Sequence, residues 1–340
     1  MGSYIIRNTD SIYSVYHENN CIYQRKRTDT GWSDPKTLAV NTGKSFSLLR
    51  SPEGKPIVIY CDKGGNIMLA GDDNPRKMVL RNTSEIKTML HIDGIMKDNT
   101  IRLFYNKDYI NESYLTEQHR REDGSWSNPL VLDSYIQDNN MTKIICLNGN
   151  YIIFYSKKVP EQQIGYREIG LNYISEFKLL YSTGYKICDY SLAVTEEEIH
   201  IAAVINTCRT SKLVYVKKNS GGISKAMILY EGPVKLCHIS IQNNKLIIIF
   251  STSRGNQQVT SFDMGASFKR TEPSAQFAFS KSVFADYTRQ IPDTFVASEL
   301  MTDPVFPFKV KMCPFIPDND ENEVERLKKE IEHLKKVAKI

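Results

Sequence analysis

The chain has 340 residues, with 44 Lys and Arg against 39 Asp and Glu, for a formal net charge of +5. This mild basic excess, without a nucleic-acid-binding motif, argues against nucleic acid as a partner. No stretch reaches the roughly 18 apolar residues of a membrane-spanning helix, and residues 1–11 lack the apolar core of a signal peptide, so we expect a cytoplasmic protein with no membrane span. The seven cysteines include no CxxC pair, and no histidines cluster, so we expect reduced thiols, no metal site and no cofactor.

Short apolar runs of β type recur along the chain at an almost constant spacing. They span residues 12–16, 57–60, 101–105, 151–155, 199–204 and 246–250. Their last residues are 44, 45, 50, 49 and 46 positions apart, which suits a four-stranded propeller blade. We therefore expect an all-β fold, a six-bladed β-propeller over residues 1–290, in which each run is the second strand of a blade.

Two tryptophan turns precede predicted outer strands. Residues 29–38 and 123–132 both read W-S-x-P-x-x-L from Trp32 and Trp126, which are 94 positions apart, or two blade lengths. Asp and Gly before the tryptophan favour a tight turn, and proline is tolerated on an outermost strand because one of its edges is unpaired. Exposed rings would stack on a glycan, whereas buried rings would be wedges between blades.

A related octapeptide over residues 261–268 reads S-x-D-x-G-x-S-F and ends at Phe268. It resembles the Asp box of sialidases and other propellers with the bacterial neuraminidase repeat, S-x-D-x-G-x-[ST]-[WF]. The repeats are also similar to those of six-bladed fucose-binding lectins. In the Asp-box family the box is a turn between the third and fourth strands, away from the active site, so the resemblance implies a fold and not a chemistry.

The catalytic residues of the sialidase family are not matched. That family uses three arginines, a Tyr with a Glu partner and an Asp, with the first arginine in an F-R-I-P or Y-R-I-P motif. Here Arg7 follows Tyr4 without the proline, and the only R-x-I-P sequence, at Arg289, lies at the other end of the chain. We expect no enzymatic activity, with a sialidase-like hydrolase or a lyase as the alternative.

A lysine stands at the start of the predicted inner strand of five blades, where it would line the central funnel. These lysines are Lys44, Lys87, Lys186, Lys235 and Lys281; the remaining blade has Lys143 nearby, and His91 and His238 follow on the same strands. Such a ring would bind an anionic glycan or phosphate. Alternatively, these lysines are solvated strand-edge residues, neutralised by acidic neighbours such as Asp189 and Glu231.

The ring is predicted to close by pairing residues 281–287 with residues 11–40, so that one blade uses both ends of the chain. Residues 291–317 contain five prolines and would form an irregular strap across the body. A seventh blade over residues 281–317 is the alternative.

The composition changes at residue 318, where a heptad pattern begins. Its apolar positions are Val324, Leu327, Ile331, Leu334 and Ala338, spaced alternately by three and four residues. We expect residues 318–340 to form a coiled-coil helix that joins the chain into a homodimer or homotrimer. Packing of this helix on its own propeller is the alternative.

These patterns favour a non-catalytic, lectin-like propeller that is oligomerised through its C-terminal helix and binds a glycan or another anionic ligand. The alternative is a scaffold subunit that binds protein within a bacterial spore or phage-type particle. The abundance of Ile, Asn, Lys and Tyr, typical of AT-rich bacterial or phage genomes, suggests this second reading.

Overall fold

The computed structural model describes residues 3–8, 11–50, 56–71, 76–81, 89–97, 100–109, 112–121, 123–134, 142–147, 150–158, 160–170, 173–242, 244–271, 280–286, 296–297, 299–302 and 310–312. Within these ranges every regular element is a β-strand, which confirms the expected all-β class. The described residues include no helix that is long and apolar enough to cross a membrane. The predicted coiled coil over residues 318–340 lies outside them.

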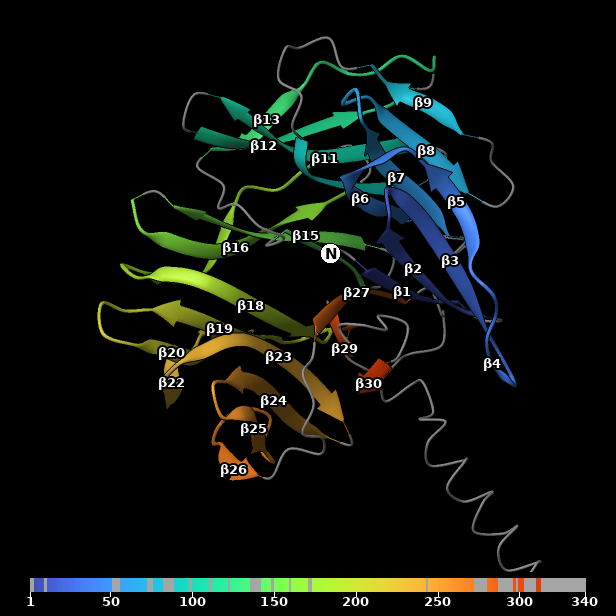
Figure 1. Cartoon of the computed structure of the whole chain (residues 1–340). Helices are drawn as coiled ribbons and strands as arrows, with labels where there is room; N and C mark the ends of the chain where they lie inside the picture. The colour runs from blue at the N-terminus through green and yellow to red at the C-terminus, as the bar shows by residue number, and fades with distance from the viewer. Residues whose placement is uncertain are drawn as a thin grey trace, which may run out of the picture.

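Six consecutive four-stranded antiparallel meanders make up most of the described chain, and Figure 1 shows them arranged around a centre. The first three are β1 (Ser3–Arg7), β2 (Ile12–Glu18), β3 (Cys21–Thr28) and β5 (Lys36–Val40); β6 (Thr42–Arg50), β7 (Ile57–Asp62), β8 (Ile67–Gly71) and β9 (Lys77–Leu80); and β10 (Met89–Lys97), β11 (Thr100–Tyr109), β12 (Glu112–His119) and β13 (Leu130–Asp133).

The other three meanders repeat this order. They are β14 (Lys143–Leu147), β15 (Asn150–Lys158), β16 (Gln162–Ile169) and β17 (Lys178–Thr183); β18 (Lys186–Val194), β19 (Ile199–Asn206), β20 (Ser211–Asn219) and β22 (Met227–Glu231); and β23 (Val234–Gln242), β24 (Lys245–Thr252), β25 (Gly255–Ser261) and β26 (Lys269–Thr271). The short strands β4 (Gly31–Trp32) and β21 (Gly222–Ile223) pair with β3 and β20. Each predicted apolar run lies in the second strand of its meander, as expected.

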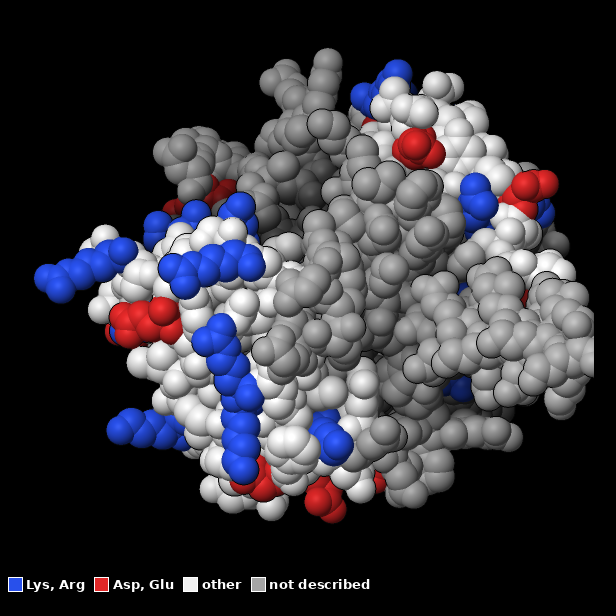
Figure 2. Space-filling view, turned by 60° about the horizontal axis from the view of Figure 1, so that its bottom comes forward, with Lys and Arg blue, Asp and Glu red and all other residues white. Residues whose placement is uncertain are grey.

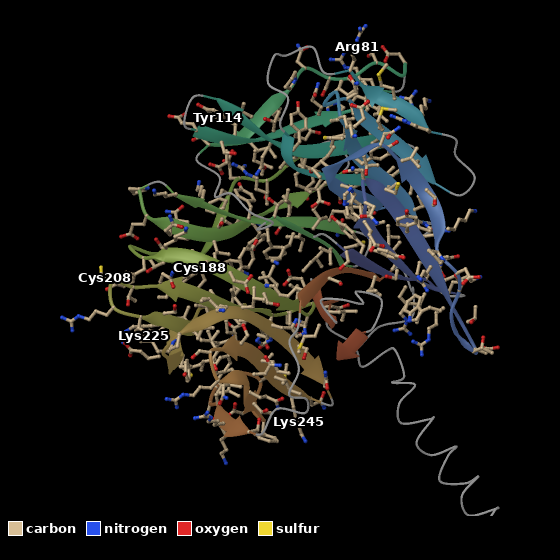
Figure 3. The ribbon with its side chains drawn as sticks, viewed as in Figure 1. Arg81, Tyr114, Cys188, Cys208, Lys225 and Lys245 are labelled. Carbon is tan, nitrogen blue, oxygen red and sulfur yellow. The ribbon has the colours of Figure 1, made fainter. Side chains whose placement is uncertain are left out.

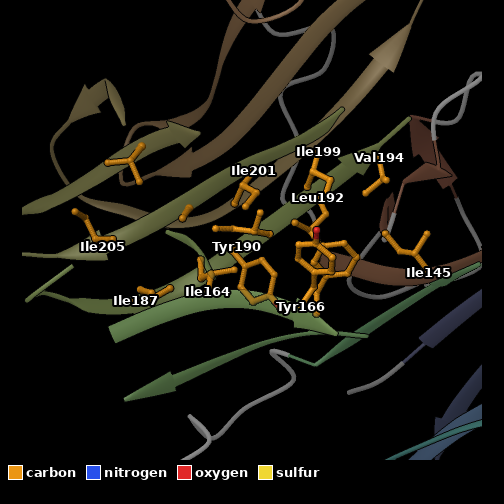
Figure 4. Packing of buried hydrophobic residues seen from close by; sticks show 14 residues of the cluster. Ile145, Ile164, Tyr166, Ile187, Tyr190, Leu192, Val194, Ile199, Ile201 and Ile205 are labelled. Atoms are coloured by element: carbon orange, nitrogen blue, oxygen red, sulfur yellow. The ribbon is translucent and has the colours of Figure 1, made fainter. Parts of the chain in front are cut away.

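Apolar clusters fill the spaces between consecutive meanders. Five clusters join the first to the second meander, the second to the third, and so on to the sixth. The cluster between the fourth and fifth meanders includes Phe154, Tyr166 and Tyr190. Figure 4 shows the rings of Tyr166 and Tyr190 among isoleucines of β18 and β19. Burial of both faces explains why second strands such as β7, β19 and β24 contain continuous apolar runs.

Four strands follow the sixth meander along the chain. They are β27 (Ser280–Asp286), β28 (Val296–Ala297), β29 (Glu299–Thr302) and β30 (Val310–Met312). β27 pairs in parallel with β1 and antiparallel with β29, which pairs with β30, while β28 pairs with β18. Met301 of β29 packs on Ile249 of β24. Figure 1 shows β27 and β29 close to the centre of the molecule.

This arrangement corrects two expectations. Residues 281–287 do not supply the inner strand of the first meander, because β1, with Ile5 and Ile6 fully buried, already occupies that position and β27 pairs on its other side. The predicted strap over residues 291–317 is not wholly irregular, because it contains β28, β29 and β30.

The octapeptide over residues 261–268 forms the turn between β25 and β26, the third and fourth strands of the sixth meander, as the resemblance implied. The Asp263 carboxylate accepts hydrogen bonds from the Ser267 backbone N–H (2.8 Å) and from the hydroxyls of Ser267 (2.6 Å) and Ser261 (2.7 Å). These bonds, first those to the Ser267 and Ser261 hydroxyls, lower the pKa of Asp263 to about 2. Gly265 has a φ of 93°, and a Cβ there would lie 1.9 Å from the Tyr215 hydroxyl.

Candidate functional site

The structure separates the predicted funnel lysines into two groups. Lys186 begins β18 and Lys235 is the second residue of β23, and both side chains are exposed. Lys281 of β27 lies deeper, with 10% of its side chain exposed. Lys87 and the side chains of Lys44 and His91 lie outside the described residues.

A buried ion-pair network, which we call the central network, holds Lys281. Its Nζ lies 2.5 Å from Asp189 Oδ1 and 3.2 Å from Glu299 Oε2, and Lys143 Nζ of β14 also pairs with Glu299. Burial alone would lower the pKa of Lys281, but the Asp189 and Glu299 carboxylates raise it above its usual value. Burial alone would raise the pKa of Glu299, but Lys143 and Lys281 lower it to about 2. Two cations therefore balance two carboxylates at the centre.

His238 of β23 also faces the interior and is 1% exposed. Neither of its ring nitrogens has a hydrogen-bond partner among the described residues. Burial lowers the pKa of His238 to about 4, although the Glu299 carboxylate opposes this shift. The ring is therefore neutral near pH 7 and packs inside the molecule, out of reach of a dissolved ligand.

The two tryptophans lie at the opposite end of the meanders from Lys186 and Lys235, because they occupy turns that lead from a third to a fourth strand. Trp32 is half-buried, with the Arg27 guanidinium 5.8 Å from its ring centroid. Trp126 packs against the cluster between the second and third meanders. The structure thus does not bring the tryptophans and these lysines together.

Exposed cations gather where the fourth to sixth meanders begin. In an antiparallel meander, the turn from the second to the third strand lies at the same end as the start of the first strand. The register shows this directly, because Lys186 pairs with Asn206 and Val234 with Thr252. We call this set the basic end; its exposed members are Lys158, Lys186, Arg209, Lys235 and Arg254.

Few carboxylates offset the basic end. Glu161 accepts a 2.6 Å hydrogen bond from the Ser182 hydroxyl, and Glu231 pairs with Lys212 at 3.1 Å. In the part of the chain that the structure describes, no acidic side chain pairs with Lys186, Arg209, Lys235 or Arg254. At the opposite end of the same meanders some charges are paired, as in Lys178–Glu168 (2.6 Å) and Lys217–Glu198 (2.6 Å), while Lys225 and Lys269 are exposed and have no acidic partner among the described residues.

The positions of Lys186 and Lys235 are fixed by contacts between neighbouring inner strands. The Cys237 backbone N–H donates to Asp189 Oδ2 (2.8 Å), and the Ile239 N–H donates to Ser191 Oγ (3.2 Å). Lys186 is three residues before Asp189 and Lys235 is two before Cys237, so both lie within about 10 Å of that contact along their strands. The two lysines therefore stand at a similar height on adjacent strands.

Sequence reasoning missed Lys158, Arg209 and Arg254. Each lies in or beside a turn from a second to a third strand, and the signal that could have found them is their regular position after the apolar run. Figure 3 labels Cys208 on the turn that carries Arg209, and Cys188 on β18 beside Lys186. In Figure 2, basic side chains stand out on the described surface with fewer acidic ones among them.

Two further expectations concern other residues. The predicted oligomerisation residues Val324, Leu327, Ile331, Leu334 and Ala338 all lie outside the described residues. The six described cysteines are free thiols, and the described residues contain no group of three or more His, Cys, Asp or Glu that could hold a metal ion.

No protein-family model matches the chain, and no curated protein matches it. Among solved structures, it is similar to the polysaccharide lyase Uly1, with a TM-score of 0.50 and 11% identity over 91% of this chain and 88% of that one. It is also similar to the BP39L lectin from Burkholderia pseudomallei (TM-score 0.49, 10% identity, 76% and 79% covered) and to the Aleuria aurantia lectin (0.43, 13%, 80% and 94%). At such identities the similarity concerns the fold alone, an all-β, propeller-like set of curled sheets.

Proposed function

We propose that the protein is a non-catalytic binding module of the propeller type that binds an anionic ligand, with glycans as the leading class, at its basic end. The observation that carries this proposal is the group of exposed cations from adjacent meanders with few carboxylates among them. Unpaired surface cations attract anions and form charge-assisted hydrogen bonds with carboxylates, sulfates and phosphates. In this proposal the meanders are six blades, and β27, β29 and β30 form a short sheet that closes the ring.

Binding is favoured over catalysis by the location of the strongly perturbed histidines. His200 and His238 have pKa values lowered to about 4, chiefly by burial, and both are almost fully inaccessible. A general acid or base must come within hydrogen-bond reach of its substrate. These two histidines are therefore better explained as core residues than as parts of a glycan-cleaving site.

The oligomeric state is a separate part of the proposal. The heptad positions from Val324 to Ala338 would join two or three copies, and several weak sites on one particle would raise avidity without any new contact. Light scattering of the full chain and of a chain lacking residues 318–340 tests this part. If both chains form particles with the same number of subunits, this part of the proposal is wrong.

Charge reversal at the basic end tests the binding site. We expect the double variant Lys186→Glu/Lys235→Glu to lose binding to an acidic glycan array and to soluble polygalacturonate. The control is Lys225→Glu/Lys269→Glu, which makes the same charge change on exposed residues at the opposite end of the same meanders. If binding weakens equally in both variants, the effect is one of net charge, and the assignment of the binding site to the basic end is wrong.

A further inference from the structure

One exposed aromatic side chain lies among the cations of the basic end. Tyr185 is 46% exposed and directly precedes Lys186, in the bend that links β17 to β18. Its backbone N–H donates to Thr183 Oγ1 at 3.2 Å. The other two exposed aromatic residues in the described ranges, Tyr173 and Phe262, both lie at the opposite end.

The cations around Tyr185 are spread over three meanders. Lys158 belongs to the fourth, Lys186 and Arg209 to the fifth, and Lys235 and Arg254 to the sixth. Each stands on a separate strand or turn, so they do not converge on one point as the ligands of a compact anion would. Their spacing across neighbouring meanders instead fits a long ligand with repeated negative charges.

We propose that the ligand of the basic end is an extended acidic polysaccharide that lies across the starts of β18 and β23, with a sugar ring against the face of Tyr185. This inference rests on the proposed function and names its ligand class. Lys186 and Lys235 contact carboxylate or sulfate groups on the sugars that flank the stacked one. Arg209 and Arg254 extend the same contacts toward the outer strands.

The small number of exposed rings also favours an acidic polysaccharide over nucleic acid as the ligand. Proteins that bind single strands use several aromatic side chains, one for each of several successive bases, in a groove of strongly basic character. Among the described residues, the basic end offers one exposed aromatic ring, that of Tyr185, and the whole chain carries a net charge of +5. An acidic polysaccharide needs only occasional ring stacking between its charged contacts.

Titration calorimetry with three polyanions tests the inference: polygalacturonate, linear polyphosphate and single-stranded DNA, at equal charge concentration. We expect polygalacturonate to bind the full chain most tightly. Tyr185→Ala should weaken that binding about 3- to 10-fold, the range of one lost ring contact, and leave polyphosphate binding unchanged. Tyr185→Phe should keep the wild-type affinity, and Tyr173→Ala, the matched control at the opposite end, should change neither ligand.

The remaining outcomes are distinct. Tighter binding of polyphosphate or DNA than of polygalacturonate, or an equal loss for all three in Tyr185→Ala, would overturn the polysaccharide assignment while anion binding at the basic end stands. No binding of any polyanion would overturn the proposed function itself.

Discussion

A tyrosine on the second strand recurs in the first four meanders. In three of them, the tyrosine hydroxyl forms a hydrogen bond with a side chain of the third strand. That side chain belongs to the residue paired with the position two before the tyrosine. Arg167 Nε donates to Tyr155 Oη (2.8 Å), and that hydroxyl donates to Asp133 Oδ2 (2.7 Å). In the second meander Ala70 occupies the third-strand position, and Tyr60 Oη is buried with no hydrogen-bond partner among the described residues.

This difference predicts opposite effects of the same substitution. Tyr155→Phe should lower the free energy of unfolding by about 1–3 kcal/mol, because Arg167 and Asp133 lose a buried partner. Tyr60→Phe should be neutral or slightly stabilising, because it removes a buried hydroxyl without a described partner. Urea unfolding of both variants measures the two effects, and equal losses would contradict the assignment of Tyr60.

The buried histidines predict acid sensitivity. The pKa of His238 is lowered to about 4 in the folded protein, against about 6.5 in an unfolded chain. Between these values the unfolded state binds more protons, so stability falls as the pH drops from about 6.5 to about 4. Three charged side chains act on the imidazole of His238: the Glu299 carboxylate opposes the lowering of its pKa, and Lys281 and Lys143 add to it.

His238→Leu removes one of these titrations. Near pH 5, the slope of unfolding free energy against pH should decrease by about 1.4 kcal/mol per pH unit, the value for one proton. His200, whose pKa is also about 4, remains and contributes to the residual slope, to which carboxylates with lowered pKa values such as Glu299 add toward the acid end. Urea unfolding in steps from pH 4.5 to 7.5 gives both slopes, and parallel curves for the two proteins would refute the assignment.

A bulge between the third and fourth strands recurs in the first five meanders. In each, the fourth strand contains one extra residue at the same place in the register. The extra residue is always apolar and packs in the core: Leu38, Val79, Leu132, Leu180 and Leu229. Bulges increase local twist and help edge strands to avoid pairing with other chains.

Adjacent leucines in β17 test this role. Leu180 is the bulged residue and is 2% exposed, whereas Leu179 is 43% exposed. Leu180→Ala should cost about 2–5 kcal/mol of unfolding free energy because it leaves a cavity in the core. Leu179→Ala makes the same chemical change at the surface and should cost no more than about 0.5 kcal/mol. Similar losses in thermal or urea unfolding would show that the bulge does not direct Leu180 inward.

The sequence motif W-S-x-P-x-x-L predicted two of these elements and missed others. Its leucine is the bulged residue, and its serine accepts a backbone hydrogen bond from the third strand, as in His119 N–H to Ser127 Oγ (3.0 Å). Ser175 and Ser224 accept the same bond from Glu168 and Lys217. Isoleucine replaces tryptophan before both serines, so the shared hydrogen bond, and not the aromatic residue, defines the turn.

At the scale of the molecule, periodicity predicted the meanders because it follows from local strand spacing. As expected, β27 joins the sheet of the N-terminal strands, but its pairing with β1 could not be predicted in the same way, because the two strands are joined only through pairs such as Ile5 and Phe284 that are far apart in the chain. The same applies to the lysines. Lys186 and Lys235 lie at the starts of β18 and β23 and are exposed, but the central network that buries Lys281 depends on Glu299, which no repeat contains.

The central network also predicts how the C-terminal strands contribute to stability. Glu299→Gln should lower the free energy of unfolding by about 3–5 kcal/mol, because Lys143 loses its buried counter-charge and Lys281 loses one of its two. The control is Glu168→Gln, which breaks the Lys178 pair, where both side chains are at least 40% exposed, and should cost at most about 1 kcal/mol. Urea unfolding at pH 7 compares the two variants.

A double-mutant cycle identifies the cause of that loss. Lys143→Met alone leaves Glu299 with one cation, whereas Lys143→Met/Glu299→Gln removes both charges and should recover part of the cost of either single variant. Losses that simply add would show no coupling between β14 and β29, and the network would not hold the C-terminal strands. Positive coupling would mean that two residues 156 positions apart, Lys143 of β14 and Glu299 of β29, hold the C-terminal strands in place through their charges.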